Sequence, residues 1–222
     1  MATERPGLWE RFWVRLLGAL DARSGRWFAC GASEIMAARP DELRRLSRIP
    51  KSYSVRAAQE DDEPQLAKLM GGEATSAPLV SSGDIGLLAV ADGEVQAMEW
   101  IRPGPAEYDR DAKRLGLVFR VPRGSCWLHN GSGGESGARG PWAMILGRLP
   151  GFLEEQGIER AYLQVACGNE YSRRCHESLG FRKIGRIVNV RLGRLRLVRW
   201  RGEGETWLRW RESRLDLERL PV

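Results

Sequence analysis

The residues best suited to ligand chemistry form a glycine-rich loop from Gly131 to Gly140. Five of its ten residues are glycine, so the backbone can approach a ligand closely without interference from side chains. Pro141 follows, and proline is favoured at the first position of a helix. Because a helix N-terminus presents unpaired N–H groups and the positive end of the helix dipole, this pattern indicates a phosphate-binding loop. A plain connecting loop is the alternative, since neither a P-loop motif nor G-x-G-x-x-G is present.

The elements around this loop must hold it in place, and they alternate between strands and helices. We predict a strand at Ser125–Asn130, a helix at Pro141–Gln156, a strand at Arg160–Ala166 and a helix at Asn169–Leu179. In the first helix an interior proline costs about 3 kcal/mol, so Pro150-Gly151 predicts a kink or a shortened helix. The core-facing residues of that helix are Ile145, Leu146, Leu149, Phe152 and Leu153, and Gly157 is the expected C-cap.

The segment after the second strand carries a more specific pattern. Asn169 and Ser172 precede the run Glu177-Ser178-Leu179-Gly180-Phe181. This segment resembles the N-x-x-S…YEKLGF region of the GNAT superfamily of acyl-CoA-dependent N-acyltransferases. Aligned on Gly140, the pyrophosphate loop of that family, [RQ]-x-x-G-x-[GA], corresponds to residues 137–142, with Gly137 at its first position and Trp142 at its last. The resemblance covers roughly Tyr53 to Leu192.

The resemblance implies a fold and a cofactor. The fold is of the α/β class, with a mixed, mostly antiparallel central sheet flanked by helices and a splayed pair of parallel strands, Ser125–Asn130 and Arg160–Ala166. The pantetheine arm of acetyl-CoA or another acyl-CoA lies between them, and no metal is expected. Asn169 and Ser172 would contact the pantetheine or its thioester end, while Asn169 also fits a helix N-cap. The residues that would hold the pyrophosphate are Gly137, Ala138, Arg139, Gly140, Pro141 and Trp142.

The resemblance also implies roles in catalysis. His176 occupies the position of the family tyrosine that protonates the departing thiolate, so it either replaces that tyrosine or leaves the step to water. For the base that deprotonates the amine, His129 is the first candidate and Glu99, on the adjacent strand, is the second. A hydrogen-bonded core histidine is the alternative interpretation of His129, and a backbone N–H near Leu128–Asn130 would stabilise the oxyanion.

The expected activity is therefore transfer of an acyl group, most simply acetyl, to an amine of a small molecule or a protein. Two alternatives keep the fold. An acyl carrier protein is an alternative donor, because the arginine-rich last third of the chain offers a basic face to an acidic partner. A catalytically silent GNAT-like binding module is the other.

Composition limits the remaining classes. The chain has 222 residues, a formal net charge of +6 and a pI of about 9.5. We expect no specific nucleic-acid binding, because no recognised module accompanies the basic charge. Integral membrane insertion is not expected, since no apolar run is long enough. Four cysteines without C-x-x-C spacing, and an N-terminus unlike a signal peptide, predict a cytoplasmic protein with reduced thiols.

Residues 1–50 are expected to form a helical appendage. Its main feature is an amphipathic helix with an apolar stripe of Leu8, Trp9, Phe12, Trp13, Leu16, Leu17 and Leu20. The stripe would pack on the acyltransferase domain or on a second subunit of a homodimer, with an interfacial membrane anchor as the alternative. We further expect a strand within Arg26–Ile35 that leads outward and a helix at Ala38–Arg48.

Residues 51–222 are expected to form the GNAT-like domain, with a C-terminal β extension from residue 193 to 222. Its first strand is predicted at Tyr53–Ala57, followed by a helix that opens at Asp61. Strands Ile85–Ala91 and Glu94–Ile101 should form a hairpin, because Asp92-Gly93 suits a type I′ turn. A second antiparallel pair is predicted between Leu115–Val121 and Ser125–Asn130. The extension alternates apolar and arginine residues at 186–192, 195–201 and 206–211, with Trp200, Trp207 and Trp210 expected to cover sheet or core.

Overall fold

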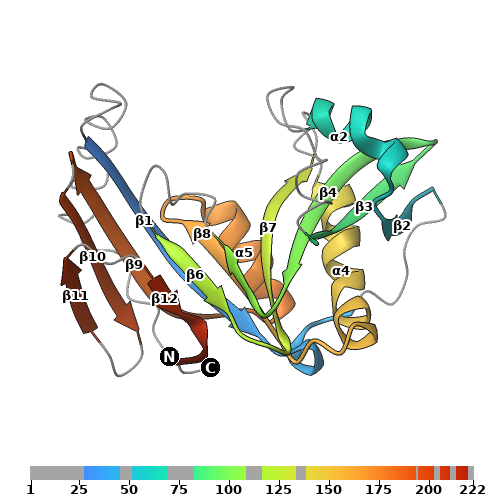
Figure 1. Ribbon diagram of the computed structural model, residues 1–222. Coiled ribbons are helices and arrows are strands. Elements are labelled where there is room, and N and C mark those ends of the chain that lie inside the picture. Colours follow the sequence, from blue (N-terminus) through green and yellow to red (C-terminus); the bar gives the residue numbers. More distant parts are fainter. Residues whose placement is uncertain are drawn as a thin grey trace.

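The computed structural model describes residues 28–45, 52–69, 83–108, 117–133, 139–193, 195–202, 206–210 and 214–219. These residues form two sheets. The larger has nine strands in the order β11-β10-β9-β1-β8-β7-β4-β3-β2, and the smaller has three in the order β12-β6-β5. Figure 1 shows that the large sheet divides into two halves that diverge between β8 and β7, with α4 packed against the β7 half.

The elements have the following bounds in chain order. They are β1 Phe28–Ala38, η1 Pro40–Glu42, β2 Ser54–Ala57, η2 Glu60–Asp62, α2 Glu63–Leu69, β3 Ile85–Ala91, β4 Glu94–Pro103, β5 Ala106–Tyr108, β6 Val118–Val121, β7 Ser125–Gly133, α4 Arg139–Glu155, β8 Arg160–Ala166, α5 Glu170–Leu179, β9 Arg182–Leu192, β10 Leu195–Gly202, β11 Thr206–Trp210, β12 Arg214–Asp216 and η3 Leu217–Arg219. No helix within these ranges is long and apolar enough to cross a membrane.

The hairpin of β3 and β4 is confirmed. Asp92 and Gly93 have φ angles of 51° and 79°, the positive values that a type I′ turn requires at both central positions. The two strands pair antiparallel from Ile85 opposite Ile101 to Ala91 opposite Glu94. This hairpin builds the half of the sheet that carries β7.

Strand β1 is an interior strand of the large sheet, between β9 and β8. It pairs antiparallel with β8 on one side and with β9 on the other, so it does not lead outward as the sequence suggested. The described part of residues 1–50 is thus integral to the sheet. The helix expected at Ala38–Arg48 is also wrong within the described residues, because β1 runs to Ala38 and only the short turn η1 follows. The amphipathic stretch 8–20 lies outside the described residues, and a domain boundary near residue 50 stays a prediction.

The antiparallel pair predicted between Leu115–Val121 and Ser125–Asn130 is wrong. Strand β6 pairs with β5 and β12 in the small sheet, whereas β7 pairs with β4 and β8 in the large one. The physical reason is that a strand has two edges, and both edges of β7 are occupied within the large sheet. The turn predicted at Pro122-Arg123-Gly124 therefore connects a strand of the small sheet to a strand of the large sheet.

Helix α4 begins two residues earlier than predicted and is not shortened at Pro150, which lies inside it. Its buried face is the predicted one, since Ile145, Leu146, Leu149 and Leu153 are buried in the core between α4 and the sheet. Burial of these side chains outweighs the backbone hydrogen bond that a proline removes. The helix ends at Glu155, and Gly157 closes its C-terminus as expected, with a φ of 66° and an N–H that donates to the carbonyl of Glu154.

The C-terminal extension is confirmed as sheet. Strand β10 continues the large sheet from β9, β11 forms its edge, and β12 joins β6 in parallel. Trp200 is fully buried in a second core, where its ring packs against the α-carbon of Gly185 so closely that a Cβ at residue 185 would overlap it. The side chains of Trp207 and Trp210 lie outside the description.

Candidate active site

The two parallel strands separate where the sequence resemblance requires. Four residue pairs join β7 to β8, from Ser125 opposite Arg160 to Leu128 opposite Leu163. Beyond Leu128 no further pair joins these two strands in the described chain, although β7 continues to Gly133 and β8 to Ala166. Figure 1 shows β7 leaving with β4 while β8 stays with β1. The facing edges past Leu128 can therefore pair with the backbone-like amides of a ligand.

A β-bulge in β7 lies at the point of separation. Trp100 of β4 pairs with His129 of β7, but the next pair is Met98 with Ser132, so β7 holds one extra residue. Asn130 supplies the unusual conformation, with a φ of 56°. A bulge bends its strand and changes the direction of its N–H groups. The sequence signal for it was Asn130-Gly131, two residues that tolerate positive φ, but the predicted strand ended there instead.

His129 is the first residue of β7 beyond the last pair with β8. It shares a face of the sheet with Trp127, since both rings contact Tyr108, and it is buried with an exposed fraction of 6%. Its Nε2 lies 3.1 Å from Oδ2 of Asp84, and the ring of Tyr108 lies 4.8 Å away between centroids. A histidine held by a carboxylate is oriented and its protonated form is stabilised, which suits a base.

Asp84 is held in turn by Arg102. Its two carboxylate oxygens accept hydrogen bonds from Nε and Nη2 of Arg102 at 2.6 and 2.9 Å, and its side chain is completely buried. Burial favours a raised pKa for Asp84, but the hydrogen bonds from His129 and Arg102 outweigh burial and hold the pKa below its ordinary value. Sequence reasoning missed both residues. No local motif marks them, because β3, β4 and β7 bring them together only in the folded sheet.

Glu99 lies on the opposite face of the sheet from His129. It points toward α4, where its Oε2 accepts a hydrogen bond from Nε1 of Trp142 at 2.8 Å. Complete burial raises the pKa of Glu99 to about 8. The α-carbon of Gly131 in the bulge packs against this carboxyl group, and a Cβ there would overlap it. The two candidate bases thus lie on opposite faces of the sheet, and the side chain of Glu99 packs against the bulge on the face that α4 covers.

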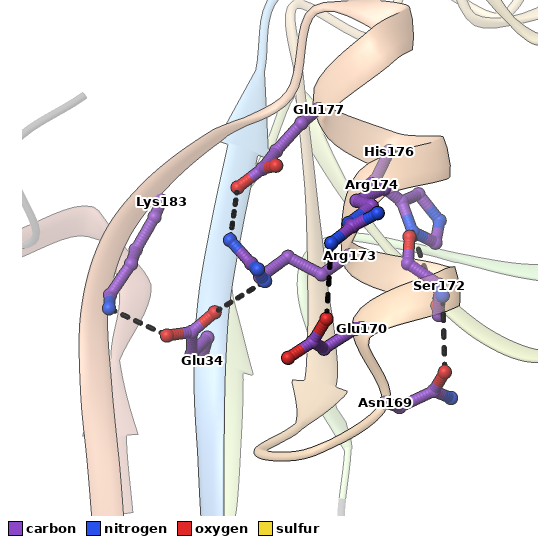
Figure 2. A network of polar contacts seen from close by, with 9 residues as sticks. All are labelled: Glu34, Asn169, Glu170, Ser172, Arg173, Arg174, His176, Glu177 and Lys183. Carbon is purple, nitrogen blue, oxygen red and sulfur yellow. Dashed lines mark hydrogen bonds and ion pairs between the residues drawn. The ribbon is translucent and has the colours of Figure 1, made fainter. Parts of the chain in front are cut away.

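His176 faces the core between α5 and α4. Its ring makes edge contacts with Trp142 and Phe181, at centroid distances of 5.1 and 5.5 Å. Burial lowers its pKa to about 4, so the ring is neutral at neutral pH. Nδ1 lies 2.8 Å from the carbonyl oxygen of Ser172, one helical turn earlier, and therefore donates its proton there (Figure 2). That proton is engaged within the helix.

The structure describes some of the predicted cofactor residues and leaves others outside the described ranges. Asn169 caps α5 as expected, because its Oδ1 accepts a hydrogen bond from the N–H of Ser172 at 3.1 Å. Gly137 and Ala138 lie outside the described residues, as does the side chain of Arg139. Gly140 and Pro141 belong to the first turn of α4, and the side chain of Trp142 packs in the core. At the N-terminus of α4 the backbone N–H groups remain the natural contacts for phosphate.

Figure 2 shows how α5 is fixed to the sheet. Glu34 of β1 lies 3.9 Å from Nε of Arg173 and 2.6 Å from Nζ of Lys183, and Arg173 also binds Glu177 on the next turn. Glu34 is thus shared by a helix and a neighbouring strand. This network sets the position of Asn169 and Ser172 beside the end of β8. Groups of three or more metal-ligating side chains are absent from the described ranges.

The fold resembles solved GNAT structures. No protein-family model and no curated protein matches the chain. A protein assigned to the GNAT family of acetyltransferases from Novosphingobium aromaticivorans matches 74% of this chain with a TM-score of 0.53 and 20% identity. GCN5-related N-acetyltransferases from Kribbella flavida and Sphaerobacter thermophilus match 85% and 90% of it, with TM-scores of 0.53 and 0.52 and identities of 16% and 14%. This chain spans 64%, 79% and 58% of those three chains, respectively. The GNAT-type fold predicted from the sequence is thereby confirmed.

Proposed function

We propose that this protein is an N-acyltransferase that moves an acyl group, most simply acetyl, from acyl-CoA to an amine. One observation carries the proposal: β7 and β8 separate at a bulge, and the first residue past the separation is a histidine held by a buried aspartate. The fold shared with GNAT acetyltransferases supports it. The acceptor is an amine of a small molecule or a protein.

Each step of the reaction has a candidate group. The pantetheine amides pair with the free edges of β7 and β8, and the pyrophosphate lies at the N-terminus of α4. His129 accepts the amine proton as nitrogen attacks the thioester carbonyl, and Asp84 holds the imidazole in place. An N–H of the bulge stabilises the oxyanion. Collapse of the intermediate forms the amide and releases the thiolate, which takes its proton from water.

Calorimetric titration with acetyl-CoA tests the donor. We expect saturable heat at up to millimolar acetyl-CoA, together with quenching of tryptophan fluorescence, because Trp142 lies in the first turn of α4. Replacing Trp142 with phenylalanine should remove most of the quenching while leaving the heat. Absence of heat at millimolar acetyl-CoA contradicts the proposed donor.

Replacement of His129 by glutamine tests the base. If His129 accepts the amine proton, kcat falls by about 10²–10⁴, the usual contribution of a positioned general base, whereas acetyl-CoA affinity is unchanged. Initial rates against a panel of amines, read by mass spectrometry, give the comparison. A variant as active as the parent protein removes His129 from the mechanism.

Replacement of His176 by phenylalanine, unlike replacement of His129, is expected to leave kcat nearly unchanged. Its ring packs between Trp142 and Phe181, and its Nδ1 proton is bound by the Ser172 carbonyl, so a phenyl ring fills the same space. We expect kcat within about threefold of the parent, in contrast to the usual effect of losing a general acid. A loss of a hundredfold or more, with the pH profile altered, would instead restore His176 as the acid.

An acyl carrier protein is the second candidate donor, and exposed arginines favour it. Arg199 and Arg201 project from β10. Carrier proteins are acidic, so complex formation should weaken steeply between about 50 and 200 mM salt if this donor is used. No product with either donor across the amine panel would favour a catalytically silent module. We also propose a cytoplasmic location, in keeping with four cysteines that form no disulfide.

A further inference from the structure

One face of the sheet formed by β9, β10 and β11 is apolar and uncovered by the other described elements. Three of the most exposed large apolar side chains lie on these strands, with exposed fractions of 58% for Leu192, 52% for Leu195 and 53% for Leu208. Figure 1 shows α5 beside β8, while no labelled helix covers β10 or β11. Exposed apolar clusters of this kind mark a contact surface.

Strand register places these side chains on one face, because residues paired across strands point the same way. The first row is Leu192 with Leu195, the second is Val190 with Leu197, and the third is Val188 with Arg199 and Leu208. Arg186 and Arg201 pair in the next row. We call this face the β9–β11 patch, defined by Val188, Val190, Leu192, Leu195, Leu197 and Leu208. Its opposite face is buried through Ile187, Val198 and Trp200.

The chain enters the sheet at the margin of this patch. Phe28, the first residue of β1, pairs with Leu192 in the first row. The preceding segment of the chain is therefore joined covalently to a residue that lies beside Leu192 and Leu195. Residues 8–20 carry an apolar stripe of leucine, tryptophan and phenylalanine that needs an apolar partner. The sequence thus supplies an apolar stripe close to a face that the other described elements leave exposed.

We propose that residues 8–20 form a helix that docks its apolar stripe on the β9–β11 patch of the same chain. The dimensions agree. A helix of that length is about 20 Å long, and the patch spans about 14 Å along the strands. Residues 21–27 reach about 23 Å when extended, enough to bring the helix back over β10.

Charge favours one direction of docking. On a helix with 100° between residues, Glu10 borders the stripe on one side, and Arg11 and Arg15 border it on the other. The patch has Arg199 within it and Arg201 beyond its third row, both exposed. The acidic border of the helix therefore faces these arginines, and Arg11 and Arg15 face solvent.

Hydrogen exchange of the full chain, read by mass spectrometry, tests the proposal. In the parent protein, amides of residues 8–20 should exchange at least about tenfold more slowly than an unstructured chain. The triple substitution Leu192→Ser, Leu195→Ser, Leu208→Ser should remove this protection while leaving β1 and β8 protected. Tyr171→Ser, which removes an exposed aromatic from α5, is the matched control and should change nothing.

Substitutions in the apolar stripe of residues 8–20 test the same contact without altering the sheet. Phe12→Ser with Trp13→Ser should also remove protection at 8–20 and should increase exchange at β10 and β11. Unprotected residues 8–20 in the parent protein overturn the proposal. It is likewise overturned by a dimer in light scattering that becomes monomeric in the triple variant, which assigns the patch to a second copy. Sedimentation of the parent protein with anionic phosphatidylserine vesicles, lost on Phe12→Ser with Trp13→Ser, assigns the stripe to a membrane surface instead.

Discussion

Replacing Asp84 with alanine is expected to lower the free energy of unfolding by about 3–5 kcal/mol, the usual cost of breaking a buried ion pair. The side chain of Arg102 is 16% exposed and would lose both contacts with the Asp84 carboxylate, so a largely buried charge would lose its opposite charge there. His129 would lose the same carboxylate. Urea unfolding followed by circular dichroism measures the change.

A surface ion pair of the same type provides the control. Arg120 and Glu107 lie 3.3 Å apart, and both side chains are about half exposed. Arg120→Ala should cost less than about 1 kcal/mol, because solvent screens that pair. If Asp84→Ala costs no more than Arg120→Ala, then the Asp84–Arg102–His129 cluster is not the structural centre that its burial indicates, and its part in positioning His129 fails with it.

The second large effect concerns pH and Glu99. The pKa of this carboxyl is about 8 in the folded protein, whereas an exposed glutamate titrates near 4.5. The folded state therefore holds a proton that the unfolded state has lost. The stability contributed by this group is fully present below pH 4.5 and is lost as pH rises to about 8. The slope is about 1.4 kcal/mol per pH unit, which accumulates to roughly 5 kcal/mol.

Glu99→Gln removes this dependence, because glutamine has no proton to lose and its carbonyl can still accept the hydrogen bond from Trp142. The useful window is pH 6.5–8, since the lowered pKa of His176 changes stability only between about 4 and 6.5. Across that window the parent protein should lose roughly 2 kcal/mol relative to Glu99→Gln in urea unfolding. Parallel stability curves for the two proteins would show that Glu99 is ionised when folded.

Several features of the site could be predicted from local sequence because they depend on local backbone chemistry. Asp92-Gly93 specified a turn because both residues adopt positive φ. Asn169 specified the start of α5 because its side chain accepts a hydrogen bond from the N–H of the residue three positions later. The buried stripe of α4 followed from helical periodicity. The strand pair that separates was predicted from the resemblance carried by Asn169, Ser172 and the Leu179-Gly180-Phe181 segment.

Other features depended on residues far apart in the chain. Pro150 predicted a kinked or shortened helix, but packing of α4 on the sheet kept the helix continuous. The partner of His129 could not be found by spacing, because Asp84 lies just before β3, far from His129 in the chain, and is held by Arg102 of β4. Likewise, the pKa of Glu99 depends on burial under α4, and the pKa of His176 on burial between α5 and α4.

Local residue preferences specify where chain segments turn, where helices are capped and where strands alternate, since those preferences act within a few residues. The sequence also carried enough of a family pattern to predict the sheet and the separating strands. Folding in three dimensions was needed to insert β1 between β9 and β8, to place β6 in the small sheet, and to bring particular charged side chains together. Those outcomes depend on competition among strand edges and on burial of charge, and both are settled only when distant segments meet.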